Sequence, residues 1–225
     1  MSDPFHISRG PRRALAPGVG TTRQRARKGE GDRLREEILD AAEQLLIQKG
    51  STDSVSMRAI ADLVGVTPPS LYIHFADKDE LFFQCCTRRF AELEEAVLSA
   101  LQGGSALDRL QAISEAYIKF GIHRGEQYVA MWTFTLPGDM TEDERQSLPG
   151  YQLLVIVAAL IAEGMKTGEI RADVDPQQAA IALWGSVHGT ALVLINKNND
   201  PTPFPVDDAA VIDQTLTIIR RGLAR

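Results

Sequence analysis

The chain has 225 residues, of which 44% are hydrophobic and 24% are charged, and its formal net charge at pH 7 is −6. This length allows one or two domains with a sizeable core, and two adjacent cysteines, Cys85 and Cys86, argue against a disulfide-stabilised mini-protein. The longest uncharged apolar run, residues 151–162, is shorter than the roughly 18 residues that a membrane span needs. The sequence therefore predicts no membrane partner and a place in the reducing cytoplasm.

The charge is divided unevenly along the chain. Residues 1–31 carry a net charge of +5, whereas residues 76–225 carry −8. Scattered glycines and prolines without periodicity predict that residues 1–31 form a disordered basic tail, either a solvated leader or an arm that contacts DNA. A basic N-terminal segment favours an anionic partner at this end of the chain. Charge alone does not distinguish DNA from RNA, a membrane surface or an acidic protein.

From Asp32 onward the apolar residues recur at helical spacing. The first predicted helix is capped by Asp32 and ends at Gly50. Ser56 caps a short helix that extends to Val64 and is broken by Gly65. Thr67 opens a second short helix, which is expected to extend to Phe75 and has prolines in its first turn. The two short helices are joined by a tight turn, as in a helix-turn-helix, whose second helix enters the major groove of DNA.

The remainder of the chain is predicted to be helical as well. Three residue pairs have the spacing of a capping box: Asp77 with Glu80, Ser105 with Asp108, and Thr141 with Glu144. The expected helices cover about 77–101, 105–123, a short segment after 141, 151–166, 176–197 and 206–223. Alternating strand patterns are absent. The predicted fold class is all-α, with about nine or ten helices.

Residues 32–82 resemble the DNA-binding region of the TetR family of bacterial transcriptional repressors. The resemblance is carried by Ser56-Met-Arg-Ala-Ile-Ala61, by Gly65-Val66, and by Thr67-Pro-Pro-Ser-Leu-Tyr-Ile-His-Phe75 followed by Lys78. It implies a three-helix DNA-binding domain over 32–82 and a ligand-binding and dimerisation domain over 83–225, with no catalytic activity.

The resemblance also implies roles for individual residues. Tyr72, His74, Lys78 and Ser56 match positions that contact DNA phosphates, and their donor groups suit phosphate oxygens. Arg58, Thr67, Pro68 and Ser70 match positions that face the groove, where an arginine reads a guanine edge through two hydrogen bonds. For Arg58 an ion pair with Asp62 one helical turn away is the alternative.

The segment Ala182-Leu-Trp-Gly-Ser-Val-His-Gly189 resembles the subgroup of this family that is named for a Trp-His-Gly signature in its C-terminal domain. The family resemblance implies a homodimer through the helices at 176–197 and 206–223, where small and apolar residues such as Val187, Gly189 and Leu216 support tight packing. Two-fold symmetry would place two recognition helices one DNA turn apart on a near-palindromic operator.

Aromatic side chains in the central helices suggest a pocket for a small apolar or aromatic effector. The candidates are Tyr117, Phe120, Tyr128, Trp132, Phe134, Tyr151 and Trp184, with His188 beside them; for each, core packing is the alternative. A repressor that such a ligand releases from DNA is the favoured function. Control by a protein partner, or by oxidation of Cys85 and Cys86, remains the second hypothesis. Neither a catalytic group, a cofactor nor a metal site is expected, since Ser186 and His188 diverge on one helix and the histidines lack metal-ligand spacing.

Overall fold

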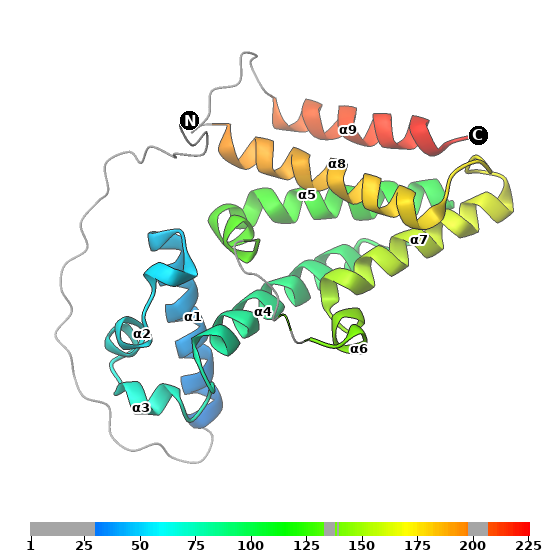
Figure 1. Cartoon of the computed structure of the whole chain (residues 1–225). Helices are drawn as coiled ribbons and strands as arrows, with labels where there is room; N and C mark the ends of the chain where they lie inside the picture. Colours follow the sequence, from blue (N-terminus) through cyan, green and yellow to red (C-terminus); the bar gives the residue numbers. More distant parts are fainter. Residues whose placement is uncertain (1–29, 133–137, 139, 198–206) are drawn as a thin grey trace, which may run out of the picture.

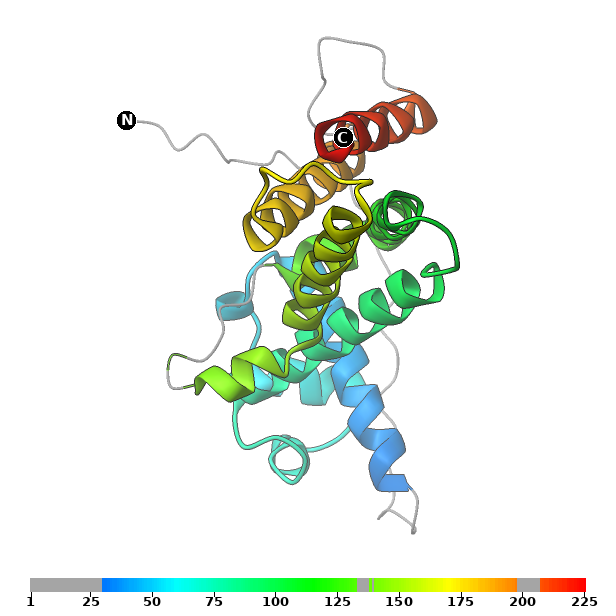
Figure 2. The same ribbon diagram turned by 90° about the vertical axis from the view of Figure 1, so that its right-hand side faces the viewer.

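A computed structural model describes residues 30–132, 138, 140–197 and 207–225. Within these residues the chain is all-α, as predicted, with nine α-helices and one short 3-10 helix. Figure 1 shows a small N-terminal unit, α1 to α3, joined by α4 to a larger helical body. Figure 2 shows α9 at the opposite end of the molecule from α1 and α3. Most of the predicted basic tail, residues 1–29, lies outside the described residues.

The N-terminal unit comprises α1 (Glu30–Lys49), α2 (Met57–Val64) and α3 (Pro68–Leu71). Its core is apolar and includes Ile38, Ile60, Leu71 and Phe75. As predicted, the Ser56 side chain accepts a hydrogen bond from the Ala59 amide at 3.2 Å. Gly65 ends α2 in the left-handed conformation, with φ of 79°, which glycine adopts without steric cost.

Two expected boundaries in this unit are wrong. The first helix begins at Glu30, so Asp32 lies inside its first turn instead of capping it. The second short helix ends at Leu71 and does not continue to Phe75. The amides of His74 and Phe75 both donate to the Leu71 carbonyl, at 2.9 and 3.0 Å, so the chain leaves the helix through a tight turn.

Helix α4 (Lys78–Ser99) belongs to both units. It buries Leu81 and Phe82 in the N-terminal core and Leu93 and Val97 in the core of the body. Asp77 caps it by accepting from the Glu80 amide at 2.8 Å. The predicted capping box is displaced by one residue, because the Glu80 carboxylate accepts from the amide of Ala76.

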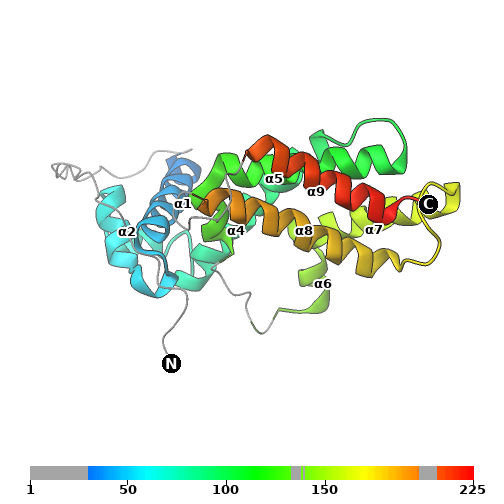
Figure 3. The ribbon, with the colours of Figure 1, turned by 90° about the horizontal axis from the view of Figure 1, so that it is seen from above.

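The body comprises α5 (Ala106–Met131), α6 (Glu142–Gln146), α7 (Pro149–Thr167), α8 (Pro176–Asn196) and α9 (Asp208–Leu223). Helices α8 and α9 lie side by side, as Figures 1 and 3 show. The capping boxes at Ser105 and Thr141 are both present. Helix α5 continues past the predicted end at His123, through a kink at Gly125 with φ 33° and ψ −97°.

Two glycines allow close approaches between segments of the body. A Cβ at Gly121 of α5 would lie 3.0 Å from the Ala191 Cβ of α8. A Cβ at Gly164 of α7 would lie 2.6 Å from Ile170 Cδ1, which is closer than real Cβ contacts. These approaches hold α8 against α5 and fold the α7–α8 connection onto the body.

By length and composition alone, α7 and α8 would be able to cross a membrane, with mean hydropathies of 1.2 and 1.5. Both are also core helices of the body: α7 buries Leu160 and Ile161, and α8 buries Val187 and Ala191. The core helices of a soluble protein pass the same test, so this feature is weak evidence for a membrane segment.

Candidate nucleic-acid interface and ligand cavity

The α2–α3 segment presents an exposed outer face on a buried support. Leu71 and Phe75 are buried and anchor the segment, and the Arg35 guanidinium of α1 lies 5.2 Å from the Phe75 ring centroid. Between these anchors, Tyr72 is 53% exposed and Ile73 is 81% exposed. The side chains of Tyr72 and Ile73 are therefore accessible to a partner that approaches this face.

The other predicted DNA contacts lie on or beside this face. Arg58 and Thr67 are exposed, whereas Pro68, Ser70 and His74 are half-buried. Within the described residues the ion pairs do not include one between Arg58 and Asp62, so the guanidinium is not held by that carboxylate.

Several of these side chains already have internal partners. Ser56 caps α2, and Thr67 Oγ1 lies 2.9 Å from Ser70 Oγ. Lys78 Nζ donates to the Thr52 carbonyl at 3.3 Å, which holds the ammonium beside the 3-10 helix Thr52–Ser54 that precedes α2. An ammonium has three N–H groups, so Lys78 retains donors for a phosphate.

An ion-pair network joins this unit to α4. Glu43 of α1 is 8% exposed and accepts hydrogen bonds from both Arg88 and Arg89. Arg88 also pairs with Glu36 and Asp40 of α1, at 3.0 and 2.8 Å. This network could not be predicted from the sequence, because its partners are about 45 residues apart along the chain.

The two cysteines lie beside this network and are buried. Burial raises the pKa of the Cys86 thiol to about 12 and raises the pKa of the Cys85 thiol as well. Cys85 Sγ lies 3.6 Å from the Leu39 carbonyl, to which it donates. Thiolates, which are the reactive form, are therefore disfavoured here.

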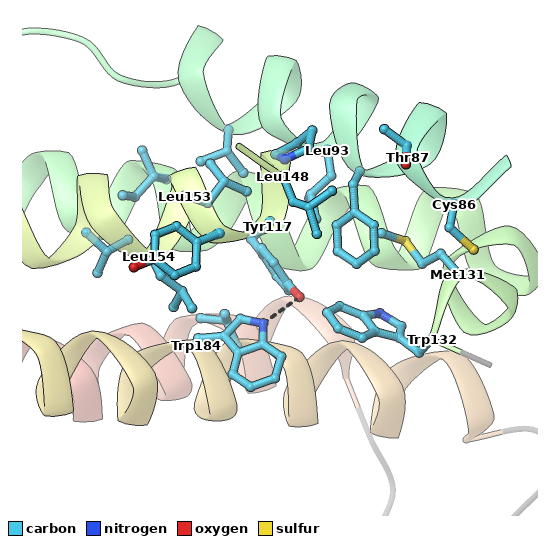
Figure 4. A pocket seen from close by; sticks show the side chains of 18 of the residues that line it. Cys86, Thr87, Leu93, Tyr117, Met131, Trp132, Leu148, Leu153, Leu154 and Trp184 are labelled. Atoms are coloured by element: carbon cyan, nitrogen blue, oxygen red, sulfur yellow. Dashed lines mark hydrogen bonds between the residues drawn. The ribbon is translucent and has the colours of Figure 1, made fainter. Parts of the chain in front are cut away.

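The body contains a cavity of about 500 Å³ between α4, α5, α6, α7 and α8 (Figure 4). Its walls are mostly aliphatic and aromatic. Four of the predicted ligand contacts line it: Tyr117, Trp132, Tyr151 and Trp184. The size and apolar character are typical of sites for small organic ligands.

The other predicted contacts are placed differently. Tyr128 is fully buried, Phe120 packs against the core and His188 is half-buried, and none of the three is among the residues that line the cavity. Phe134 lies outside the described residues. Sequence reasoning also missed Ser114 and the mouth residues Glu142 and Arg145; an isolated polar residue near aromatic positions carries no distinctive sequence signal.

A hydrogen-bonded cluster forms the cavity wall between α5 and α8. Trp184 Nε1 donates to Tyr117 Oη at 3.1 Å, and Tyr128 Oη donates to Tyr117 Oη at 3.0 Å. His188 Nδ1 lies 2.6 Å from Tyr128 Oη. Burial raises the pKa of both phenols and lowers the pKa of His188, so all three groups are neutral at pH 7. His188 thus supports the wall from behind.

The end of α5 connects the cavity with the N-terminal unit. Ala130 is buried in the core of that unit, whereas its neighbours Met131 and Trp132 line the cavity. Helix α4 and the last turn of α5 therefore each contact both the cavity and the core of the N-terminal unit.

Comparisons with known proteins agree with this architecture. The family model described as "Bacterial regulatory proteins, tetR family" matches residues 38–85, and the model described as "Tetracyclin repressor-like, C-terminal domain" matches residues 110–218. Together they cover well over half of the chain. The Trp-His-Gly subgroup is not confirmed by these matches.

Curated and solved relatives support the same assignment. The HTH-type transcriptional repressor KstR2 of Rhodococcus jostii is 28% identical over 201 residues, which are 84% of this chain and 91% of KstR2. A TetR family regulator from Marinobacter aquaeolei has a TM-score of 0.68 at 18% identity, over 87% of this chain and 98% of that one. AibR, solved with isovaleryl coenzyme A and operator DNA, has a TM-score of 0.65 at 19% identity, over 82% and 97%. The chain belongs to the tetR family of bacterial transcriptional regulators and is not an enzyme.

Proposed function

We propose that this regulator is a cytoplasmic, homodimeric repressor that a small apolar ligand releases from a near-palindromic operator. The observation that carries the proposal is the cavity of about 500 Å³, because α4 supplies part of its wall and also begins beside the helix-turn-helix. The relatives support it by name: KstR2 is a repressor, and AibR was solved with an acyl thioester and operator DNA.

For DNA binding, two groups of side chains have distinct roles. Tyr72, His74, Lys78 and Ser56 donate to phosphates and position the protein. The groove-facing residues are Arg58, Thr67, Pro68 and Ser70. Because prolines leave few base-reading donors on α3, Arg58, contacts with thymine methyl groups and DNA shape supply much of the specificity.

The dimer is expected to form through the outward faces of α8 and α9. Ile181, Val193 and Ile218 are exposed, and a Cβ at Gly185 or Gly189 would contact nothing within 4 Å. Ile181, Gly185, Gly189 and Val193 follow each other at intervals of four, so they form one row on α8. Val187 and Leu216, which the sequence suggested for tight packing, instead face the protomer's own core.

Release from DNA requires that the ligand binds the DNA-incompetent arrangement more tightly. A preference of about 5.5 kcal/mol moves a two-state population from 1:99 to 99:1. Helix α4 transmits this difference, because it lines the cavity and its first turn holds Lys78 in the N-terminal unit.

The test is a linked titration. A fluorescent operator is bound to the protein, and a series of alkylbenzenes and alkyl phenyl ketones of increasing chain length is added while tryptophan fluorescence and operator anisotropy are recorded together. We expect at least one member to change both signals with a common midpoint, because coupling between two sites is reciprocal. A saturating change in tryptophan fluorescence with the operator still bound would contradict the role of the cavity.

The second hypothesis assigned control to a protein partner or to thiol oxidation, and the surroundings of the two cysteines do not support thiol oxidation. Both thiols are buried with raised pKa values, whereas redox-sensing cysteines are exposed and have low pKa values.

A further inference from the structure

Two residues of α5 that carry hydroxyl groups line the apolar cavity. Ser114 and Tyr117 are three residues apart and therefore lie on the same side of the helix. Both are buried, with Ser114 only 2% exposed. They are the hydroxyl-bearing residues that α5 contributes to this wall.

The Tyr117 oxygen already accepts two hydrogen bonds. One comes from Trp184 Nε1 at 3.1 Å, the bond drawn in Figure 4, and the other comes from Tyr128 Oη at 3.0 Å. These two bonds use the acceptor capacity of a hydroxyl oxygen. What remains at Tyr117 is its own O–H proton, which needs an acceptor.

The nearest nitrogen does not supply that acceptor. The Tyr128 hydroxyl already donates its proton to Tyr117. The 2.6 Å contact between Tyr128 Oη and His188 Nδ1 is therefore a hydrogen bond only if Nδ1 carries a proton. His188 Nδ1 also lies 3.4 Å from Tyr117 Oη. A protonated Nδ1 has no lone pair to offer, so the Tyr117 proton finds no acceptor among the side chains of this cluster.

Ser114 adds a second unused donor. Its Oγ is buried and makes no hydrogen bond within the part of the chain that the structure describes. A serine in a helix often donates to the carbonyl four residues earlier, and this one does not. A buried hydrogen-bond donor without an acceptor destabilises the protein. A ligand oxygen that accepts from both Tyr117 and Ser114 would satisfy two such donors.

We propose that the effector carries a carbonyl oxygen within its apolar body, and that this oxygen accepts hydrogen bonds from Tyr117 and Ser114. The inference rests on the proposed role of the cavity as the effector site. At about 30 Å³ for each atom of water size, the cavity holds about fifteen non-hydrogen atoms. The ligand class is therefore a medium-sized apolar ketone, ester or thioester, and a pure hydrocarbon lacks the group that the wall selects.

The experiment compares two probes that differ in the carbonyl group, hexanophenone and hexylbenzene. The protein reports binding itself, because its two tryptophans, Trp132 and Trp184, both line the cavity. Dissociation constants are measured by tryptophan fluorescence on the full-length wild type and on Tyr117→Phe and Ser114→Ala. Ser186→Ala is the matched control, since that hydroxyl is exposed on α8 and bonds to the Ala182 carbonyl.

We expect Tyr117→Phe to weaken hexanophenone binding about tenfold and Ser114→Ala to weaken it about fivefold, the range for one hydrogen bond. Hexylbenzene should bind both variants at least as tightly as the wild type, and Ser186→Ala should change neither probe. Equal losses for both probes, or no loss for the ketone, would overturn the carbonyl assignment while leaving the cavity as an effector site. If neither probe binds the wild type, the inference and the proposed effector role fail together.

Discussion

Replacing Glu43 by glutamine is expected to loosen the N-terminal unit from α4. The side chain is 10% exposed and accepts hydrogen bonds from Arg88 and Arg89. Breaking a buried pair costs about 3–5 kcal/mol when it leaves a charge uncompensated. Here Arg88 keeps Glu36 and Asp40, and Arg89 keeps Glu92, so a smaller loss of about 2–3 kcal/mol is expected, in line with charge-assisted hydrogen bonds.

Thermal unfolding followed by circular dichroism measures this loss. For a chain of this size, 2–3 kcal/mol corresponds to a decrease in Tm of about 5–10 °C. The matched control is Glu163→Gln, because Glu163 pairs with Arg109 but its side chain is 49% exposed. An exposed pair contributes about 0–1 kcal/mol. The Tm values of Glu43→Gln and Glu163→Gln are compared directly. A difference of less than roughly 1 °C would mean that the ion-pair network does not stabilise the N-terminal unit.

Four further predictions concern the body, the buried cysteines, the DNA-binding face and the dimer interface. Gly164→Ala should lower the free energy of unfolding by about 1–3 kcal/mol, because the new Cβ would overlap with Ile170. Gly222→Ala has open space around the new Cβ and should raise the free energy of unfolding by up to about 1 kcal/mol. Denaturant titrations measure both changes. At pH 8, native Cys86 should react with iodoacetamide about a thousandfold more slowly than in the unfolded chain, since its pKa is raised to about 12; equal rates would restore the thiol hypothesis. Lys78→Ala should weaken operator binding and reduce the salt slope by about one per protomer, and an unchanged slope would contradict a phosphate contact. Gly185→Glu should prevent dimerisation in sedimentation analysis, because it places charge on the outward row of α8; an intact dimer would place the interface elsewhere.

The boundaries that the sequence predicted well are those that local chemistry decides. Ser56, Ser105 and Thr141 cap their helices through contacts within four residues, and Gly65 ends α2 through its own backbone freedom. Such features depend on neighbours along the chain, so spacing alone reveals them.

The features that were missed depend on contacts between distant segments. Helix α5 passes the expected end at His123, because packing of Tyr128 and Ala130 against two cores stabilises the helix beyond the kink at Gly125. Tyr128 lies behind the cavity wall and bonds to Tyr117, whereas Tyr117 itself lines the cavity. A list of aromatic residues cannot separate these two positions, because only the arrangement of α5 against α8 does so.

Whether the protein binds a near-palindromic operator as a dimer is tested by selecting bound DNA from a random duplex pool. The selection uses refolded protein from which any ligand has been removed. We expect a near-palindrome whose half-sites lie one helical turn apart, bound with an affinity that falls steeply with salt. Failure of a folded dimer of this protein to enrich any sequence would contradict the account.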